Sequence, residues 1–110
     1  MGNITVIGSS NTDLIMQVDK IPGPGETLLS NQFSIAAGGK GANQAIAAAR
    51  AGGNVTFIAC IGTDNFGDNA IEGFKKENIN TSFIKRNNDV PSGIAIIFVD
   101  TNGENSIGVA

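Results

Sequence analysis

The sequence has 110 residues, of which 41% are hydrophobic and 15% charged, and this composition predicts a globular chain and not a disordered one. A formal charge of −3 offers no basic field for nucleic acid or an anionic membrane surface. Histidine is absent and Cys60 is the single cysteine, which excludes His-ligated metal sites, Ser-His-Asp or Cys-His catalytic groups and an internal disulfide.

The sequence shows no export or membrane segment. Its start lacks the basic region and the apolar core of a signal peptide. The longest apolar run, residues 94–99, is too short to span a bilayer. One cysteine also favours a reducing compartment. We therefore expect a soluble, cytoplasmic protein with no nucleic-acid or membrane partner.

In the first half of the chain, short apolar runs alternate with glycine-rich turns. Residues 4–7 and 14–18 predict strands, and residues 27–35 predict an exposed or edge strand after a loop rich in proline and glycine. The alanine-rich segment 42–51 predicts a helix that ends at two glycines. Residues 55–61 are apolar on both faces, which is typical of a central parallel strand.

The second half repeats this alternation. Asp64 is placed to cap a helix that runs to about Glu77. Further strands are predicted at 79–84, 94–99 and 105–110, the last two joined by an Asn-Gly hairpin turn.

Strand, glycine-rich turn, helix, strand and helix in succession predict a doubly wound α/β fold. Two helices and few central strands are fewer units than such a sheet normally contains. We therefore expect residues 1–110 to form the front part of a larger α/β domain. By itself, the incomplete sheet would leave a strand edge unpaired and should self-associate.

The glycines before the first helix form the first candidate site. Gly39, Lys40 and Gly41 would let backbone N–H groups and a positive charge approach an oxygen-rich ligand at the helix N-terminus. Neither a P-loop nor a dinucleotide fingerprint is present, because Lys40 is followed by glycine and Gln44 stands at the last glycine position. A tight turn that serves only helix packing is an equally good interpretation.

Asn11 and Asp13 form the second candidate site. In an extended segment they would point to the same side, as an amide and a carboxylate suited to binding two hydroxyl groups. An Asx-type turn between two strands is the alternative, and spacing alone favours that turn. For Cys60, in an apolar strand, a buried core position is expected, and for Asp64 a cap is preferred over a ligand.

Three motifs together resemble a known family. They are Gly8-Ser9-Ser10-Asn11-Thr12-Asp13, Pro24-Gly25-Glu26-Thr27 and Gly38-Gly39-Lys40-Gly41-Ala42-Asn43-Gln44-Ala45. With the segments 57–67, 92–95 and 103–107, they resemble the N-terminal part of ribokinase-like members of the PfkB carbohydrate kinase family. The resemblance covers essentially the whole chain.

This resemblance implies a ribokinase-like doubly wound sheet, present in its N-terminal part only, with a small β-sheet lid from about 14–35 and 92–110. It implies ATP-dependent phosphorylation of the 5-hydroxyl of D-ribose. Fructose, a nucleoside or another sugar is the alternative substrate, and a non-catalytic, sugar-binding and dimerising clasp is the alternative function. A homodimer through the lid strands is implied too. The residues that the resemblance places at the sugar are Asn11, Asp13, Gly39, Lys40, Gly41, Asn43, Ala95 and Ile107.

One departure from the family is large. Its Gly-Ala-Gly-Asp motif, with the catalytic Asp, belongs to the C-terminal half of these enzymes and is not found in residues 1–110. The resemblance implies that ATP, Mg²⁺ and a monovalent cation such as K⁺ bind mainly there. We therefore expect residues 1–110 to hold sugar contacts, with no catalytic residue, no metal ligand and no kinase activity by themselves.

Overall fold

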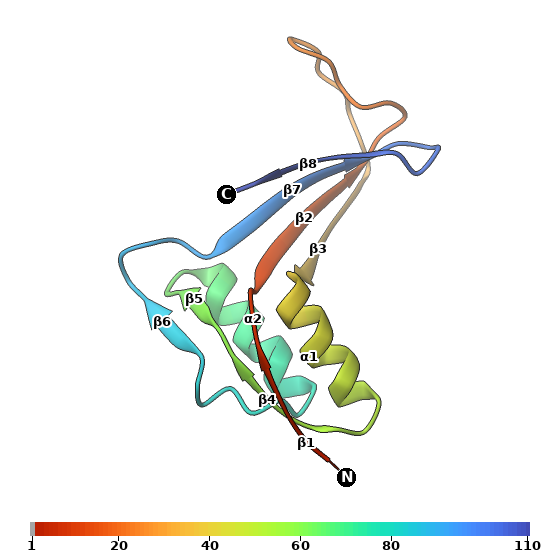
Figure 1. The fold of residues 1–110 in the computed structure, drawn as a ribbon. Helices are drawn as coiled ribbons and strands as arrows, with labels where there is room; N and C mark the ends of the chain where they lie inside the picture. Colours follow the sequence, from red (N-terminus) through yellow and green to blue (C-terminus); the bar gives the residue numbers. More distant parts are fainter. Residues whose placement is uncertain (1) are drawn as a thin grey trace.

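Two parts of different construction make up residues 2–110, which a computed structural model describes (Figure 1). The core part contains β1 (Asn3–Ile7), α1 (Lys40–Arg50), β4 (Asn54–Ile58), β5 (Cys60–Gly62), α2 (Asn65–Lys76) and β6 (Lys85–Asn87). The four-stranded sheet contains β2 (Asn11–Gln17), β3 (Gln32–Gly38), β7 (Gly93–Val99) and β8 (Asn105–Val109). Figure 1 shows this sheet extending away from the helices.

The core part is built on a central parallel strand, as predicted. β4 pairs with β1 on one side, while Thr56 bridges to Asn80 and β5 pairs with β6 on the other. Alternate side chains of this strand, Val55 and Phe57, are buried against both helices. The rings of Phe57 and Phe74 meet edge to face, with centroids 5.2 Å apart.

Both helices begin and end close to where the sequence predicts. α1 buries Ala42 and Ala45, whose small side chains let the helix pack closely on the sheet. Asp64 caps α2 by accepting a hydrogen bond from the Gly67 N–H over 2.9 Å. None of the helices in residues 2–110 is long and apolar enough to cross a membrane.

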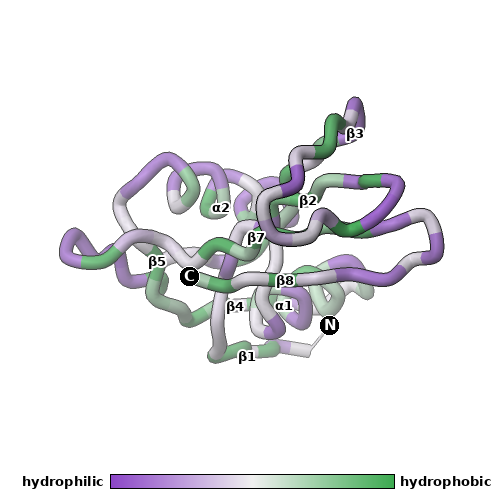
Figure 2. The backbone as a smooth tube through the Cα atoms, turned by 90° about the horizontal axis from the view of Figure 1, so that it is seen from above, coloured by the Kyte–Doolittle hydropathy of each residue, from purple (hydrophilic) through white to green (hydrophobic). Residues whose placement is uncertain are grey.

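The four-stranded sheet has the order β3-β2-β7-β8. β2 pairs antiparallel with β3 and parallel with β7, and β7 pairs antiparallel with β8. The hairpin between β7 and β8 forms at the predicted Asn-Gly turn, where the Asp100 carboxylate accepts from the N–H groups of Asn102 and Glu104. Figure 2 shows this turn as hydrophilic, in contrast to the apolar strand β7 that leads into it.

Strand register defines two faces of this sheet, because residues that pair across strands share a side. We call the first the Asp13 face; it carries Asn11, Asp13, Ala36, Gly38, Gly93, Ala95, Ile97, Ile107 and Val109. We call the other the Phe33 face; it carries Thr12, Leu14, Met16, Phe33, Ile35, Ile94, Ile96 and Phe98.

Several strand predictions were wrong in their limits. Residues 27–31 lie in the loop before β3, which does form an edge strand but begins at Gln32. Residues 79–84 form only the single bridge at Asn80, and the strand lies further on, in β6. The central strand is interrupted at Ala59. Tertiary pairing, which local propensity does not contain, decides these limits.

Cys60 is exposed, and the prediction of a buried core cysteine was wrong. Its neighbours Ile61 and Phe57 point into the helix-covered face, so the strand's alternation turns Cys60 to the other side. In residues 2–110, both helices cover the same face of the central strand.

Candidate functional site

Asn11 and Asp13 lie in β2, in extended backbone, so the interpretation as an Asx-type turn was wrong. Their side chains point to the same side of the sheet and are half-buried. β2 is an inner strand, paired on both edges, and this pairing holds the two side chains in place.

Glycines flank these two side chains on the neighbouring strands. Gly38 of β3 pairs with Asn11, and a Cβ atom added at Gly38 would overlap the Asp13 carboxylate. Gly93 of β7 pairs with Asn11 on the other edge, and a Cβ atom there would overlap the Asn11 side-chain oxygen. The carboxylate and the amide therefore lie across the backbone of the neighbouring strands, in the space that side chains at Gly38 and Gly93 would otherwise fill.

Register brings two apolar candidates to the same face. Ala95 pairs directly with Asp13 and is buried. Ile107 pairs with Ile97, two residues further along β7, and is 53% exposed. Asn11 and Asp13 come from β2, while Ala95 and Ile107 come from the β7–β8 hairpin about 80 residues later, yet all four share the Asp13 face.

The N-terminus of α1 adjoins Asn11. Gly39 has a φ of 91°, and a Cβ atom on it would lie 2.8 Å from the Ser9 carbonyl oxygen and 3.0 Å from the Asn11 nitrogen. Only glycine accommodates both this conformation and this close approach. No side chain of the described residues caps this helix. Of its first N–H groups, that of Ala42 donates to the Ser9 carbonyl oxygen at 3.0 Å, so backbone caps part of this helix N-terminus, and the positive end of the helix dipole lies near Asn11.

Lys40, Gly41 and Asn43 differ in their settings at this helix start. Lys40 and Asn43 are exposed and three residues apart, so they lie on one side of the first turn. Gly41 is buried, and a Cβ atom there would lie 2.7 Å from the Gly8 Cα atom. Gly41 therefore permits close packing of α1 on the segment after β1, and its contact with a ligand stays a prediction.

A polar cluster around Asp64 joins the core part to β7. The sequence predicted that Asp64 caps α2, but not that it contacts Ser92. Besides capping α2, the Asp64 carboxylate accepts from the Ser92 hydroxyl at 2.7 Å and from the Ser92 N–H at 2.8 Å. These contacts, led by the Ser92 hydroxyl, lower the pKa of Asp64. They stabilise the fold above the carboxyl's unfolded pKa, about 3.9, and are lost as pH falls through the lower folded value. Ser92 is 28 residues away, and no local sequence signal marks it.

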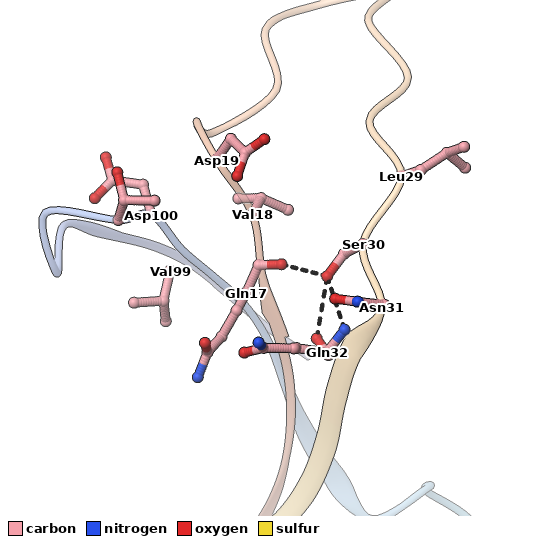
Figure 3. Close-up of a pocket in the computed structure, with 10 residues that line it drawn as sticks. Gln17, Val18, Asp19, Leu29, Ser30, Asn31, Gln32, Val99 and Asp100 are labelled. Atoms are coloured by element: carbon pink, nitrogen blue, oxygen red, sulfur yellow. Dashed lines mark hydrogen bonds between the residues drawn. The ribbon is translucent and has the colours of Figure 1, made fainter.

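A cavity lies elsewhere in the four-stranded sheet. A volume of about 620 Å³ opens at the outer end of the four-stranded sheet, between the end of β2, the start of β3 and the end of β7 (Figure 3). Gln17 and Ser30 line it, and the Ser30 hydroxyl donates to the Gln17 carbonyl. Asp13 is four residues from Gln17 along β2, about 13 Å away, so this cavity is not the candidate site.

Comparison with known proteins identifies the family. Residues 1–110 match the pfkB family carbohydrate kinases over their whole length. The chain is 47% identical to a ribokinase of Dictyostelium discoideum over 96% of this chain and 33% of that protein. It is 44% identical to a deoxyribokinase of Salmonella typhimurium over 96% of this chain and 34% of that protein.

The fold agrees with this assignment. A solved structure of Arabidopsis thaliana ribokinase complexed with ribose and ATP superposes with a TM-score of 0.85, at 30% identity, over 99% of this chain and 35% of that one. The chain belongs to the pfkB family of carbohydrate kinases and has the ribokinase-like fold of its N-terminal portion. It spans about a third of the length of the relatives it matches (33% for the Dictyostelium protein).

Proposed function

We propose that residues 1–110 supply the sugar-binding part of an ATP-dependent kinase that phosphorylates D-ribose at its 5-hydroxyl. The observation that carries this proposal is the Asp13 face, which places one carboxylate, one amide and two apolar side chains on the same side of the sheet, next to the N-terminus of α1. A sugar presents the complementary surface of hydroxyl groups and C–H edges.

Each group on this face has a distinct part in the proposal. The Asp13 carboxylate accepts hydrogen bonds from two sugar hydroxyls, and the Asn11 amide both donates and accepts. The exposed side chains of Lys40 and Asn43, in the first turn of α1, donate to sugar oxygens, which the positive end of the helix dipole also attracts. Ala95 and Ile107 cover the apolar side of the sugar and exclude water from it, which favours transfer to the sugar over hydrolysis of ATP.

ATP, Mg²⁺ and K⁺ belong to the proposal for the whole protein that contains residues 1–110. Residues 2–110 contain no group of three or more His, Cys, Asp or Glu side chains that could hold a metal ion. The glycine turn at Gly39–Gly41 lacks the Ser or Thr of a P-loop.

We also propose that the protein is a homodimer joined through the four-stranded sheet, which would act as a lid over the sugar. The Phe33 face supports this, because Phe33 and Ile35 of β3 and Ile96 of β7 are 58%, 60% and 50% exposed. Leu14 and Met16 of β2 lie between these two strands on the same face. Contiguous exposed apolar side chains of this kind mark protein interaction surfaces.

The test is a substrate panel on the complete protein that contains this chain. ADP release with ATP is measured with D-ribose, 2-deoxy-D-ribose, D-fructose and adenosine at equal concentrations. We expect the highest kcat/KM with D-ribose. A preference for deoxyribose, fructose or adenosine would contradict the ribose assignment, and no release with any of them would contradict the kinase assignment.

A second experiment uses residues 1–110 by themselves. It tests the proposal that they bind the sugar but lack the ATP-binding and catalytic part of the kinase. We expect them to release no ADP with ATP and ribose and to self-associate in sedimentation, because within residues 2–110 β1 pairs only with β4 and its other edge is open to strands of other chains. A stable monomer that phosphorylates ribose would contradict this expectation.

A further inference from the structure

Three segments connect the core part to the four-stranded sheet, and they are held in different ways. Residues 8–10 and Gly39 lie against each other, with the Ser9 carbonyl accepting from the Ala42 N–H at 3.0 Å. The third segment, 88–92, leads from β6 into β7. It is attached at its end by side-chain hydrogen bonds, all of which involve Ser92.

Ser92 is attached to the core part at two points. Its hydroxyl accepts from the Gly62 N–H at 3.1 Å and donates to Asp64 at 2.7 Å, while its own N–H donates to the second Asp64 oxygen at 2.8 Å. The side chain is buried, with 8% exposure, so these bonds do not compete freely with water. Because Asp64 is itself bound to the first turn of α2, Ser92 is tied to a packed helix.

The residue that follows Ser92 belongs to the candidate site. Gly93 pairs with Asn11 and leaves the space that the Asn11 side-chain oxygen occupies. Two residues later, Ala95 pairs with Asp13. A shift of Ser92 would therefore move the backbone on which Asn11 rests and the apolar surface beside Asp13.

We propose that Asp64 and Ser92 are positioning residues for the sugar: they set where β7 leaves the core part and thereby hold Asn11 and Ala95 at the distances that sugar binding requires. This inference rests on the proposed function of the Asp13 face. Asp64 and Ser92 themselves need not touch the sugar. Their loss should weaken sugar binding while leaving the affinity for ATP in place.

The experiment compares Ser92→Ala and Asp64→Asn with the parent protein, as complete proteins. Ser92→Ala removes the hydroxyl but keeps the Asp64 cap of α2. In Asp64→Asn, one of the two carboxylate oxygens becomes an NH₂ group. Depending on its orientation, the amide then loses the acceptor for the Ser92 N–H or the acceptor for the Gly67 N–H. We expect the KM for the sugar to rise about tenfold in both, as misplaced binding groups lose affinity steeply, with the KM for ATP changed by less than about twofold.

Glu77→Gln is the matched control. Glu77 also joins two elements through a carboxylate, since it binds Arg50 of α1 at 2.6 Å, but it lies at the end of α2 away from the connecting segments. We expect a small change in melting temperature and no change in either KM. The control thus separates loss of a carboxylate contact from loss of position at β7.

The outcomes distinguish this inference from the proposed function. If the parent protein releases no ADP with any sugar, the proposed function fails. If the parent protein is active and the KM for the sugar is the same in Ser92→Ala as in the control Glu77→Gln, the positioning role is wrong. Equal rises in the sugar and ATP KM values would also overturn it, because they indicate a general loss of structure. Should Asp64→Asn not fold, Ser92→Ala decides by the same criteria.

Discussion

The two faces of the four-stranded sheet share strands and hydrogen bonds but present different chemistry. On the Asp13 face, two polar side chains lie over glycines, and apolar residues stand beside them. On the Phe33 face, phenylalanine, isoleucine, leucine and methionine side chains follow one another across β3, β2 and β7. One strand thus serves both faces, with alternate residues assigned to each.

This difference fits the proposed separation of sugar binding from chain association. A small polar ligand needs a few fixed hydrogen-bonding groups, and the glycines on neighbouring strands leave room for the Asn11 and Asp13 side chains. A protein partner needs a broad apolar area, which bulky side chains provide. Substitutions on the two faces should therefore affect different measurements, and the predictions below compare them from the largest effect to the smallest.

The largest effect is expected from Asp13→Ala on the Asp13 face. Loss of a hydrogen bond to a charged group costs about 1.5–3 kcal/mol, and two sugar hydroxyls lose their partner, so kcat/KM for the sugar should fall at least about 100-fold. Steady-state kinetics of the complete protein measures this. Asp19→Ala, in the exposed loop after β2, is the control and should keep the parent's kinetics. An unchanged sugar KM in Asp13→Ala would contradict the assignment of this face.

Phe33→Glu tests the other face. Burial of a charge among Ile35, Met16 and Phe98 without a partner is costly. The dissociation constant of the dimer should therefore increase by about 100-fold or more. Sedimentation over a range of protein concentrations measures it. Leu29→Glu introduces the same charge at a 97% exposed side chain outside the sheet and should leave the dimer intact. A Phe33→Glu protein that remains dimeric would exclude this face as the interface.

The smallest effects come from a matched pair of isoleucines. Ile107 on the Asp13 face and Ile96 on the Phe33 face are 53% and 50% exposed. Truncation of a partly buried side chain at a contact costs about 1 kcal/mol, or about fivefold. Ile107→Ala should raise the sugar KM by that factor and leave dimerisation unchanged, and Ile96→Ala should do the reverse. If both variants change the same measurement, the two faces are not functionally separate.

Local features of the structure could be read from the sequence, because they depend on neighbouring residues alone. Alanine content and two terminal glycines predicted α1, the Asp64 position predicted the cap of α2, and Asn102-Gly103 predicted the hairpin turn. The two-residue spacing of Asn11 and Asp13 placed both side chains on one side, provided that the segment was extended. The motifs also carried the family resemblance, which the comparisons confirm.

What the tertiary structure alone decided is which distant residues meet. β2 pairs in parallel with β7, more than 80 positions away by the Asn11↔Gly93 register, and a shift of one residue would turn Ala95 to the opposite face. The exposure of Cys60 and the bonds between Asp64 and Ser92 depend in the same way on which strands pair and which face the helices cover. Periodicity assigns a residue to a side of its own strand; only pairing between strands determines what lies next to it.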